Sequence, residues 1–306
     1  SRSRCGGMVP VLPGLYVGGA ESCSSSKALA AAGVMAVLTV DAEEPPPLPG
    51  VRTLYIRALD EPGADLLSRL DDHRLVSPFA CSQAGVSRSV AVVTAYLMKT
   101  QGLGWEEAYA AVRAAKPDAE VNPGFQRQLK LYEAMGCAVD SSSALYKQHR
   151  LQVLTERFSE LQDLPQEVFA VDPTIACQTP NTEVLYRCRK CRRALFRSSS
   201  ILSHVEGSGP TAFAHKRITE STHLRGSGPD KCTSYFIEPV QWMEPALLGV
   251  TEGQLLCPKC TSKLGSFSWW GEQCSCGHWV TPAFQIHKSR VDEARTLSVG
   301  NFHTAK

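Results

Sequence analysis

Residues 83–89 form a run of small residues that ends in Arg88 and Ser89 and leads directly into an apolar helical run. Backbone N–H groups of such a loop and of the following helical turn converge, and the helix dipole favours an anion there. Arg88 adds a planar guanidinium that can hold two phosphate oxygens. The sequence therefore predicts a phosphate-binding loop made of Gln83, Ala84, Gly85, Val86, Ser87 and Arg88. The alternative is an ordinary glycine-containing turn with the arginine facing water.

Two neighbouring residues are candidates for a nucleophile at this loop. Ser82 has five residues between itself and Arg88 (88 − 82 − 1), and Cys81 stands one place earlier. A thiol titrates near pH ~8.5, and a helix N-terminus beside arginine lowers its pKa further. A serine hydroxyl instead needs an adjacent general base, which the loop does not offer. We therefore expect residues 82–89, here called the cradle, to bind phosphate more readily than they hydrolyse it.

The expected elements around the cradle alternate between strands and helices. The apolar, β-branched run 34–40 is typical of a strand buried on both faces, and residues 11–19 and 54–60 predict further strands. Helices are expected at residues 26–32 and after Asn122, a residue type that caps helices. This alternation predicts an α/β fold with a sheet flanked by helices.

The cradle resembles the Cys-x5-Arg signature of the dual-specificity phosphatases, and the order of elements resembles that family over about residues 10–136. The resemblance implies a phosphotyrosine-phosphatase-like sheet and hydrolysis of phosphotyrosine and phosphoserine or phosphothreonine through a phosphocysteine, without a metal. It makes Asp60 the general acid, puts the nucleophile at Ser82, and gives Ser89 a hydroxyl that helps the leaving thiolate. Asn122 would support the cradle. For Asp60, the alternative is a solvated loop carboxylate.

The segment before the cradle departs from this family. Only 21 residues (82 − 60 − 1) separate Asp60 from Ser82, fewer than the resemblance implies. Pro78 cannot donate to a β-ladder and is out of place in a central strand. We therefore expect a truncated or misjoined segment at about residues 70–83, without the central strand that normally supports such a loop.

The second half of the chain carries two Cys-x2-Cys knuckles, Cys188/Cys191 and Cys257/Cys260. Each knuckle offers two thiolates, so together they predict a closed, structural zinc site with four cysteines. The 65 residues between the knuckles (257 − 191 − 1) predict a subdomain inserted between the halves of the site. Disulfides are the alternative, but short-spaced pairs in a chain without a recognisable secretion signal are more typical of metal ligands.

A second zinc site is expected from Cys232, Cys274 and Cys276 together with one histidine, for which His204 and His287 are preferred. Zinc at these sites would supply much of the folding free energy of this half. The alternative is a set of unligated buried cysteines.

Residues 183–292 resemble the C-terminal zinc-binding domain of one group of dual-specificity phosphatases, including fungal relatives. The residues that carry the match lie in three blocks, at 186–193, 234–243 and 274–286. This resemblance ties the domain to assembly of the large ribosomal subunit, which implies a location in nucleus and cytoplasm.

The predicted organisation has four parts. We expect a phosphatase domain at residues 8–140, a linker at 141–182 that rests partly on that domain, a small β-rich zinc-binding domain at 183–292 and a tail at 293–306.

The resemblance implies a phosphoprotein substrate, and charge and hydropathy indicate what else the chain could bind. The formal net charge of +2 gives the whole chain no pull towards nucleic acid. Six cations lie between residues 187 and 197, however, and together with Trp269, Trp270 and Trp279 they could contact RNA or a pre-ribosomal particle. The alternative is a solvated surface over a packed aromatic core. We expect no membrane partner, because no apolar run reaches the roughly 18 residues of a membrane span.

Overall fold

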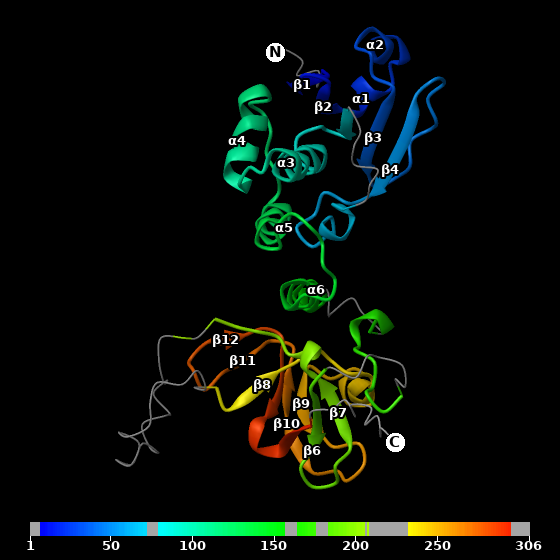
Figure 1. The fold of residues 1–306 in the computed structure, drawn as a ribbon. Helices are drawn as coiled ribbons and strands as arrows, with labels where there is room; N and C mark the ends of the chain where they lie inside the picture. Colours follow the sequence, from blue (N-terminus) through cyan, green and yellow to red (C-terminus); the bar gives the residue numbers. More distant parts are fainter. Residues whose placement is uncertain are drawn as a thin grey trace, which may run out of the picture. The chain divides into compact units, whose positions relative to one another are not determined.

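The computed structural model of the protein describes residues 7–71, 79–156, 164–175, 183–205, 207 and 232–294. The chain divides into two units, Ser1–Asp140 and Ser141–Lys306, which are shown in Figure 1. No helix among the described residues is long and apolar enough to cross a membrane.

The first unit is built on a five-stranded sheet. Its strands are β1 (Val9–Leu12), β2 (Leu15–Gly19), β3 (Ala36–Asp41), β4 (Arg52–Arg57) and β5 (Phe79–Ser82), in the order β1-β2-β5-β3-β4. The prediction of one strand over residues 11–19 is wrong, because a turn with Gly14 at φ +79° separates β1 and β2 into an antiparallel hairpin. The other strands run parallel, so their carboxyl ends share one edge of the sheet.

The strand that delivers the cradle is present, which corrects the expectation that it is missing. All four residues of β5 are buried, and the strand pairs in parallel with β2 on one side and β3 on the other. The strand consists of three small residues and one phenylalanine. It forms because the strands on both sides provide partners for its backbone hydrogen bonds. Pro78 lies outside the described residues.

The helices among the described residues of this unit are α1 (Ala20–Cys23), α2 (Ser26–Ala31), α3 (Arg88–Gln101), α4 (Trp105–Ala115) and α5 (Pro123–Ala134), and the 3-10 turn η1 (Leu67–Arg69) precedes β5. Helix α3 is apolar almost all round and buried along most of its length, as expected for a core helix. Helix α5 holds the segment that follows the predicted acid, because the side chain of Gln128 accepts from the N–H groups of Leu66 and Leu67.

The second unit is rich in short antiparallel strands, as predicted. The strands are β6 (Leu185–Cys188), β7 (Ala194–Arg197), β8 (Ser234–Phe236), β9 (Glu252–Leu256), β10 (Lys263–Ser268), β11 (Glu272–Gln273), β12 (Trp279–Val280), β13 (Ala283–His287) and β14 (Val291–Ala294). One sheet has the order β8-β13-β10-β9, a second has the order β14-β6-β7, and β11 pairs with β12. Short helical turns connect them: η4 (Gln166–Val168), η5 (Ser198–Ser200), η7 (Gln241–Met243), α7 (Glu244–Leu247) and η8 (Lys288–Arg290).

Helix α6 (Ala144–Glu156), predicted as part of a linker resting on the first domain, belongs to the second unit. Its Leu151 is fully buried in the same apolar cluster as Phe196 and Trp269. Lys147 Nζ donates to Glu238 Oε1 at 2.7 Å and to the carbonyl oxygen of Ser199 at 2.8 Å. The helix is therefore a packed element of this unit rather than a free connector.

Candidate phosphate site and metal centres

The cradle joins the end of β5 to the start of α3, and its backbone is held by two other segments. Gln83 O accepts a hydrogen bond from the N–H of Ala20, and Val86 O accepts one from the N–H of Glu120. Gly85 has φ +71°, and a Cβ atom there would lie 2.4 Å from the carbonyl carbon of Gly18, so only glycine fits. Gln83 and Ala84 are exposed, Val86 is half-buried, and Gly85, Ser87 and Arg88 are buried.

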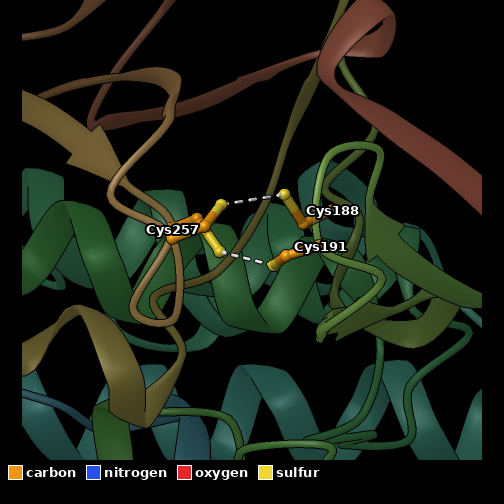
Figure 2. Close-up of side chains that lie close together, drawn as sticks. Cys188, Cys191 and Cys257 are labelled. Atoms are coloured by element: carbon orange, nitrogen blue, oxygen red, sulfur yellow. Dashed lines mark hydrogen bonds between the residues drawn. The ribbon is translucent and has the colours of Figure 1, made fainter.

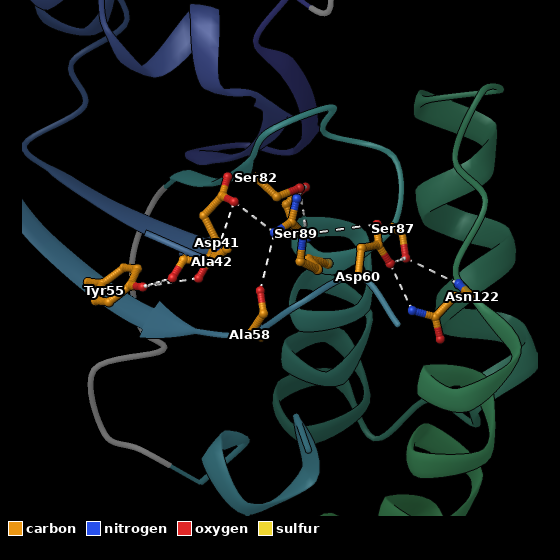
Figure 3. A network of polar contacts seen from close by, with 10 residues as sticks. Asp41, Ala42, Tyr55, Ala58, Asp60, Ser82, Ser87, Ser89 and Asn122 are labelled. Atoms are coloured by element: carbon orange, nitrogen blue, oxygen red, sulfur yellow. Dashed lines mark hydrogen bonds and ion pairs between the residues drawn. The ribbon is translucent and has the colours of Figure 1, made fainter. Parts of the chain in front are cut away.

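Ser82 stands where the resemblance puts the nucleophile, and its hydroxyl faces the start of α3. Its Oγ donates to Ser89 Oγ at 3.1 Å and accepts from the Ser89 backbone N–H at 3.3 Å, as Figure 3 shows. Both side chains are buried. Ser89 thus contacts the nucleophile position, as its predicted role requires, but here it contacts a hydroxyl rather than a thiolate.

Cys81, the second candidate nucleophile, does not face the cradle. Neighbouring residues of a strand point to opposite faces of the sheet, and the Cys81 sulfur lies in an apolar cluster with Phe79 and Leu29. It is bonded to Cys23 in a disulfide. A fully buried, disulfide-bonded sulfur on the opposite face of the strand is not a nucleophile for a phosphate held by the cradle.

The side chain of Arg88 is buried, and it is held by groups that the sequence did not indicate. Its Nη1 donates to Asp41 Oδ1 at 2.7 Å and to Ala58 O at 3.2 Å. Its Nε lies 3.9 Å from Asp60 Oδ2, which is beyond hydrogen-bond reach. Asp41 is the residue at this arginine that sequence reasoning missed, since a single acid at the end of a buried strand has no distinguishing spacing.

Asp60, the predicted general acid, lies just past β4, and its carboxylate is hydrogen-bonded to the cradle. Its Oδ1 accepts from Ser87 Oγ at 2.7 Å and from Asn122 Nδ2 at 2.8 Å. Asn122 also caps α5, because its Oδ1 accepts from the N–H of Phe125. The two roles predicted for Asn122 therefore coexist, and Figure 3 shows this network with the acid between loop and helix.

The two knuckles of the second unit bring four cysteines together (Figure 2). The sulfur atoms of Cys188, Cys191, Cys257 and Cys260 all lie within 4.8 Å of one another, with 3.8 Å between Cys188 and Cys260 and 3.5 Å between Cys191 and Cys257. A tetrahedral zinc ion with Zn–S bonds of ~2.3 Å separates its sulfurs by roughly 3.8 Å. These residues, here the four-cysteine group, could thus hold a metal ion, and their spacing fits zinc.

Both knuckles have the same backbone construction. The fourth residue after the first cysteine has a positive φ, at Arg192 and at Thr261, and its N–H donates back to the carbonyl of that cysteine. Without metal, hydrogen bonds from the side chain and then the backbone of Ser262 lower the pKa of Cys260 to about 6. Burial raises the pKa of Cys257 to about 12. Burial raises the pKa of Cys188, but hydrogen bonds from the backbone of Cys191 and from the side chain of Ser262 outweigh it and lower that pKa. The knuckle fold therefore favours the thiolate on two of the four ligands.

A second group combines His204 with Cys232, Cys274 and Cys276, and is called here the mixed group. His204 Nε2 lies 3.5 Å from the sulfur of Cys232 and 3.4 Å from that of Cys276. Zn–S bonds of ~2.3 Å and Zn–N bonds of ~2.0–2.1 Å in a tetrahedron give a sulfur–nitrogen distance of roughly 3.5 Å. This group also has the donor set and spacing of a closed zinc site.

His287, the other preferred histidine, is not among the ligand groups that the described residues form. It ends β13, where its Nδ1 lies 3.0 Å from the hydroxyl of Ser234 on the paired strand β8. Burial, followed by the charges of Lys263 and Arg290, lowers the pKa of His287. Its part is therefore that of a hydrogen-bonded residue in the sheet, and strand pairing rather than spacing distinguishes it from His204.

The predicted basic cluster is largely paired with acids. Arg189 and Arg192 both contact the carboxylate of Asp292, and Arg193 contacts Asp172. Of the three tryptophans, Trp269 is fully buried, whereas Trp270 and Trp279 are 59% and 58% exposed.

Comparison with known proteins identifies the family of this chain. The chain is 58% identical to human dual specificity protein phosphatase 12 over 323 aligned positions, which cover 100% of this chain and 94% of the human protein. The chain belongs to the dual specificity protein phosphatase family. The corresponding rat protein is 56% identical over 99% of this chain and 94% of its own length, and the fission yeast tyrosine-protein phosphatase yvh1 is 35% identical over 82% and 73%.

The family model for the dual specificity phosphatase catalytic domain matches residues 80–135, which begin within β5. The solved structure of human DUSP28 has 38% identity and a TM-score of 0.40, and covers 43% of this chain and 95% of its own. The alignment with the human phosphatase has at least 17 positions without a counterpart in this chain (323 − 306).

At family level the chain is thus a protein phosphatase with phosphoprotein substrates, as the sequence predicted. The described residues supply a loop between β5 and α3, a buried arginine, an acid, and an asparagine that donates to the acid and to Ser87 of the loop. Ser82 stands where the family resemblance puts the nucleophile.

Proposed function

We propose that this chain binds phosphorylated protein segments in the cradle and hydrolyses them far more slowly than a thiolate enzyme. The observation that carries the proposal is the position of Ser82, whose hydroxyl meets Ser89 at the start of α3. A phosphate seated on the N–H groups of the cradle would face this oxygen. A phosphocysteine cannot form on it.

The groups around Ser82 support binding without turnover. A serine nucleophile needs a base to take its proton. The hydrogen-bond partners of Ser82 Oγ are the hydroxyl and the N–H of Ser89, neither of which is a base. Asp60, the predicted general acid, is hydrogen-bonded to Ser87 and Asn122 rather than to Ser82.

The test is the substitution Ser82→Cys, with Ser82→Ala as the matched control of similar size. Hydrolysis of a small aryl phosphate should rise by at least about 10³-fold in Ser82→Cys, because a thiolate at this position is activated by the helix and Arg88. Ser82→Ala should leave the slow rate unchanged. Orthophosphate binding, measured by titration calorimetry, should persist in all three proteins. A rate typical of the family in the unsubstituted chain, lost in Ser82→Ala, would contradict the proposal.

We further propose that Zn²⁺ occupies the four-cysteine group and the mixed group as a structural ion. The sulfur and nitrogen distances given above support this assignment, as does the set of four donors in each group, which fills a tetrahedral ion completely. Neither group takes part in the phosphate chemistry.

As a second function we propose that the zinc-binding unit contacts RNA of a pre-ribosomal particle, which places the protein in nucleus and cytoplasm. The supporting observation is the exposure of Trp270 and Trp279 beside the short β11–β12 pair. Stacking of a base on an exposed aromatic ring is worth ~1–3 kcal/mol. The carboxylate of Asp292 already neutralises part of the basic cluster, so stacking rather than charge should dominate.

The double substitution Trp270→Ala/Trp279→Ala should therefore weaken binding of a single-stranded RNA oligonucleotide by about tenfold or more, with little change in its salt dependence. Leu248→Ala, which removes a different exposed apolar side chain, is the control. Equal affinity of the double variant and the parent would contradict this second function.

A further inference from the structure

A carboxylate on β3 holds the arginine of the cradle. Asp41 is the last residue of β3, and its Oδ1 accepts from Arg88 Nη1 at 2.7 Å. Both partners are removed from bulk water, with side-chain exposures of 6% for Arg88 and 18% for Asp41. A charge-assisted hydrogen bond in such surroundings is short and geometrically specific.

The carboxylate is itself fixed by its surroundings. Asp41 Oδ1 also accepts from the N–H of Ala42 at 2.8 Å. The hydroxyl of Tyr55, on the neighbouring strand β4, lies 3.1 Å from Asp41 O and 3.0 Å from Ala42 O. The backbone that carries the carboxylate is thus clamped, so the position of Asp41 does not depend on Arg88 alone.

The rest of the guanidinium has an unused donor. Nη1 donates to Asp41 and to Ala58 O, whereas the buried Nε makes no hydrogen bond with any described residue. A buried donor left without a partner is unfavourable, and more so when the group is charged. Nε lies on the side of Asp60, which is bonded to Ser87 of the cradle. An oxyanion in the cradle would satisfy this donor.

We propose that Asp41 is a positioning residue for phosphate binding, because it anchors Nη1 of Arg88 and so turns Nε towards the bound oxyanion. This inference rests on the proposed phosphate-binding function. Asp41 would not touch the ligand and acts through Arg88. Its negative charge by itself opposes binding of an anion, so the positioning effect and the charge effect have opposite signs.

Two substitutions separate these effects. Asp41→Asn keeps an oxygen that can accept from Nη1 but removes the charge, and Asp41→Ala removes both. Glu43→Ala is the matched control, because it removes an exposed carboxylate two residues further along the chain. Orthophosphate affinity is measured by titration calorimetry, and the side-chain Nε–H NMR signal of Arg88 is recorded with and without phosphate. Thermal melting confirms that each variant is folded.

We expect Asp41→Ala to weaken orthophosphate binding by about tenfold, since a fixed arginine becomes mobile, while Asp41→Asn and Glu43→Ala stay within about threefold of the parent. The Arg88 Nε–H signal should be sharp in the parent and in Asp41→Asn, and broadened in Asp41→Ala. Equal affinities for Asp41→Ala and Asp41→Asn, or tighter binding in Asp41→Ala, would overturn the inference.

The two readouts distinguish this inference from the proposed function. If the parent chain does not bind orthophosphate, the proposed function fails, and the Nε–H signal without phosphate then decides on Asp41. A signal that remains sharp in Asp41→Ala shows that Asp41 does not position Arg88.

Discussion

The first unit, which carries the cradle, and the second unit, which carries the two cysteine-rich groups, differ in how completely the chain supplies the atoms of their candidate sites. The four-cysteine group and the mixed group have four donors each, and their spacings match a tetrahedral ion. The cradle has its loop, its arginine and its acid, and Ser82 stands where the family resemblance puts the nucleophile. One unit therefore offers two full sets of donors, and the other offers a frame in which we propose that the attacking atom is altered.

The difference follows from what each site does for the fold. A structural zinc ion is part of the folding free energy, so loss of one ligand removes the stability of its whole surroundings. The cradle is held by its backbone, by Gly85 against Gly18 and by the Asp41–Arg88 pair. The hydroxyl of Ser82 donates to Ser89 at the start of α3, so a serine at this position fits the frame of the cradle.

Metal removal should give the largest difference between the units. Structural zinc in small domains contributes about 10–16 kcal/mol, so a chelator should unfold the second unit and leave the first folded. Hydrogen exchange read by mass spectrometry would show loss of protection in β9 and β10 and retained protection in α3. Metal analysis should find about two zinc ions per chain before chelation.

Matched cysteine substitutions sharpen this result. Cys257→Ser should reproduce the effect of chelation at the four-cysteine group, whereas Cys137→Ser, at a free cysteine of the first unit, should leave both units folded. Unchanged protection of β9 and β10 after chelation would mean that the two units do not differ in how far their folding depends on metal.

A smaller difference between the units is expected when a paired lysine is substituted in each of them and the loss of stability is measured. Lys147 and Glu238 form an ion pair in the second unit with both side chains largely buried, at 11% and 7% exposure. Lys147→Met should destabilise that unit by about 3–5 kcal/mol, because Glu238 is left charged and unpaired. Lys147→Met/Glu238→Leu should recover most of the loss. Denaturant unfolding followed in the second unit measures both.

The comparison lysine lies in the first unit, where Lys116 pairs with Asp118, an acid that is 45% exposed. Since water can solvate Asp118 when its partner is removed, Lys116→Met should cost only about 0–1 kcal/mol from the lost ion pair. Equal losses for Lys116→Met and Lys147→Met would show that burial of the acid does not decide the effect.

Several elements of both sites could be predicted because their signals are local. The cradle, the knuckles and the cap at Asn122 each consist of residues a few positions apart, and their backbone chemistry needs no distant partner. The strand β5 could not be predicted in the same way. Its four residues carry no pattern of their own, and they become a central strand because β2 and β3 flank them.

The sequence could not decide which of the two histidines joins the cysteines, because this too depends on distant neighbours in the fold. His204 and His287 have equivalent side chains, and neither stands at a fixed spacing from the cysteines. Pairing of β13 with β8 places His287 beside Ser234, whereas the chain after β7 brings His204 to Cys232 and Cys276. Helix α6 shows the same limit, because a helix between two domains carries no sign of which one it will pack on.

The sequence by itself predicted the loop typical of the phosphatase family, the serine at position 82 and the cysteines of both groups that could hold a metal ion, because residue type and short spacing indicate that chemistry. Tertiary structure alone decided that Cys81 faces the core while Ser82 faces the cradle, since adjacent strand residues point to opposite faces only once the sheet is formed. It also decided that Asp41 meets Arg88 across 46 intervening residues (88 − 41 − 1), because parallel strands bring their carboxyl ends to one edge.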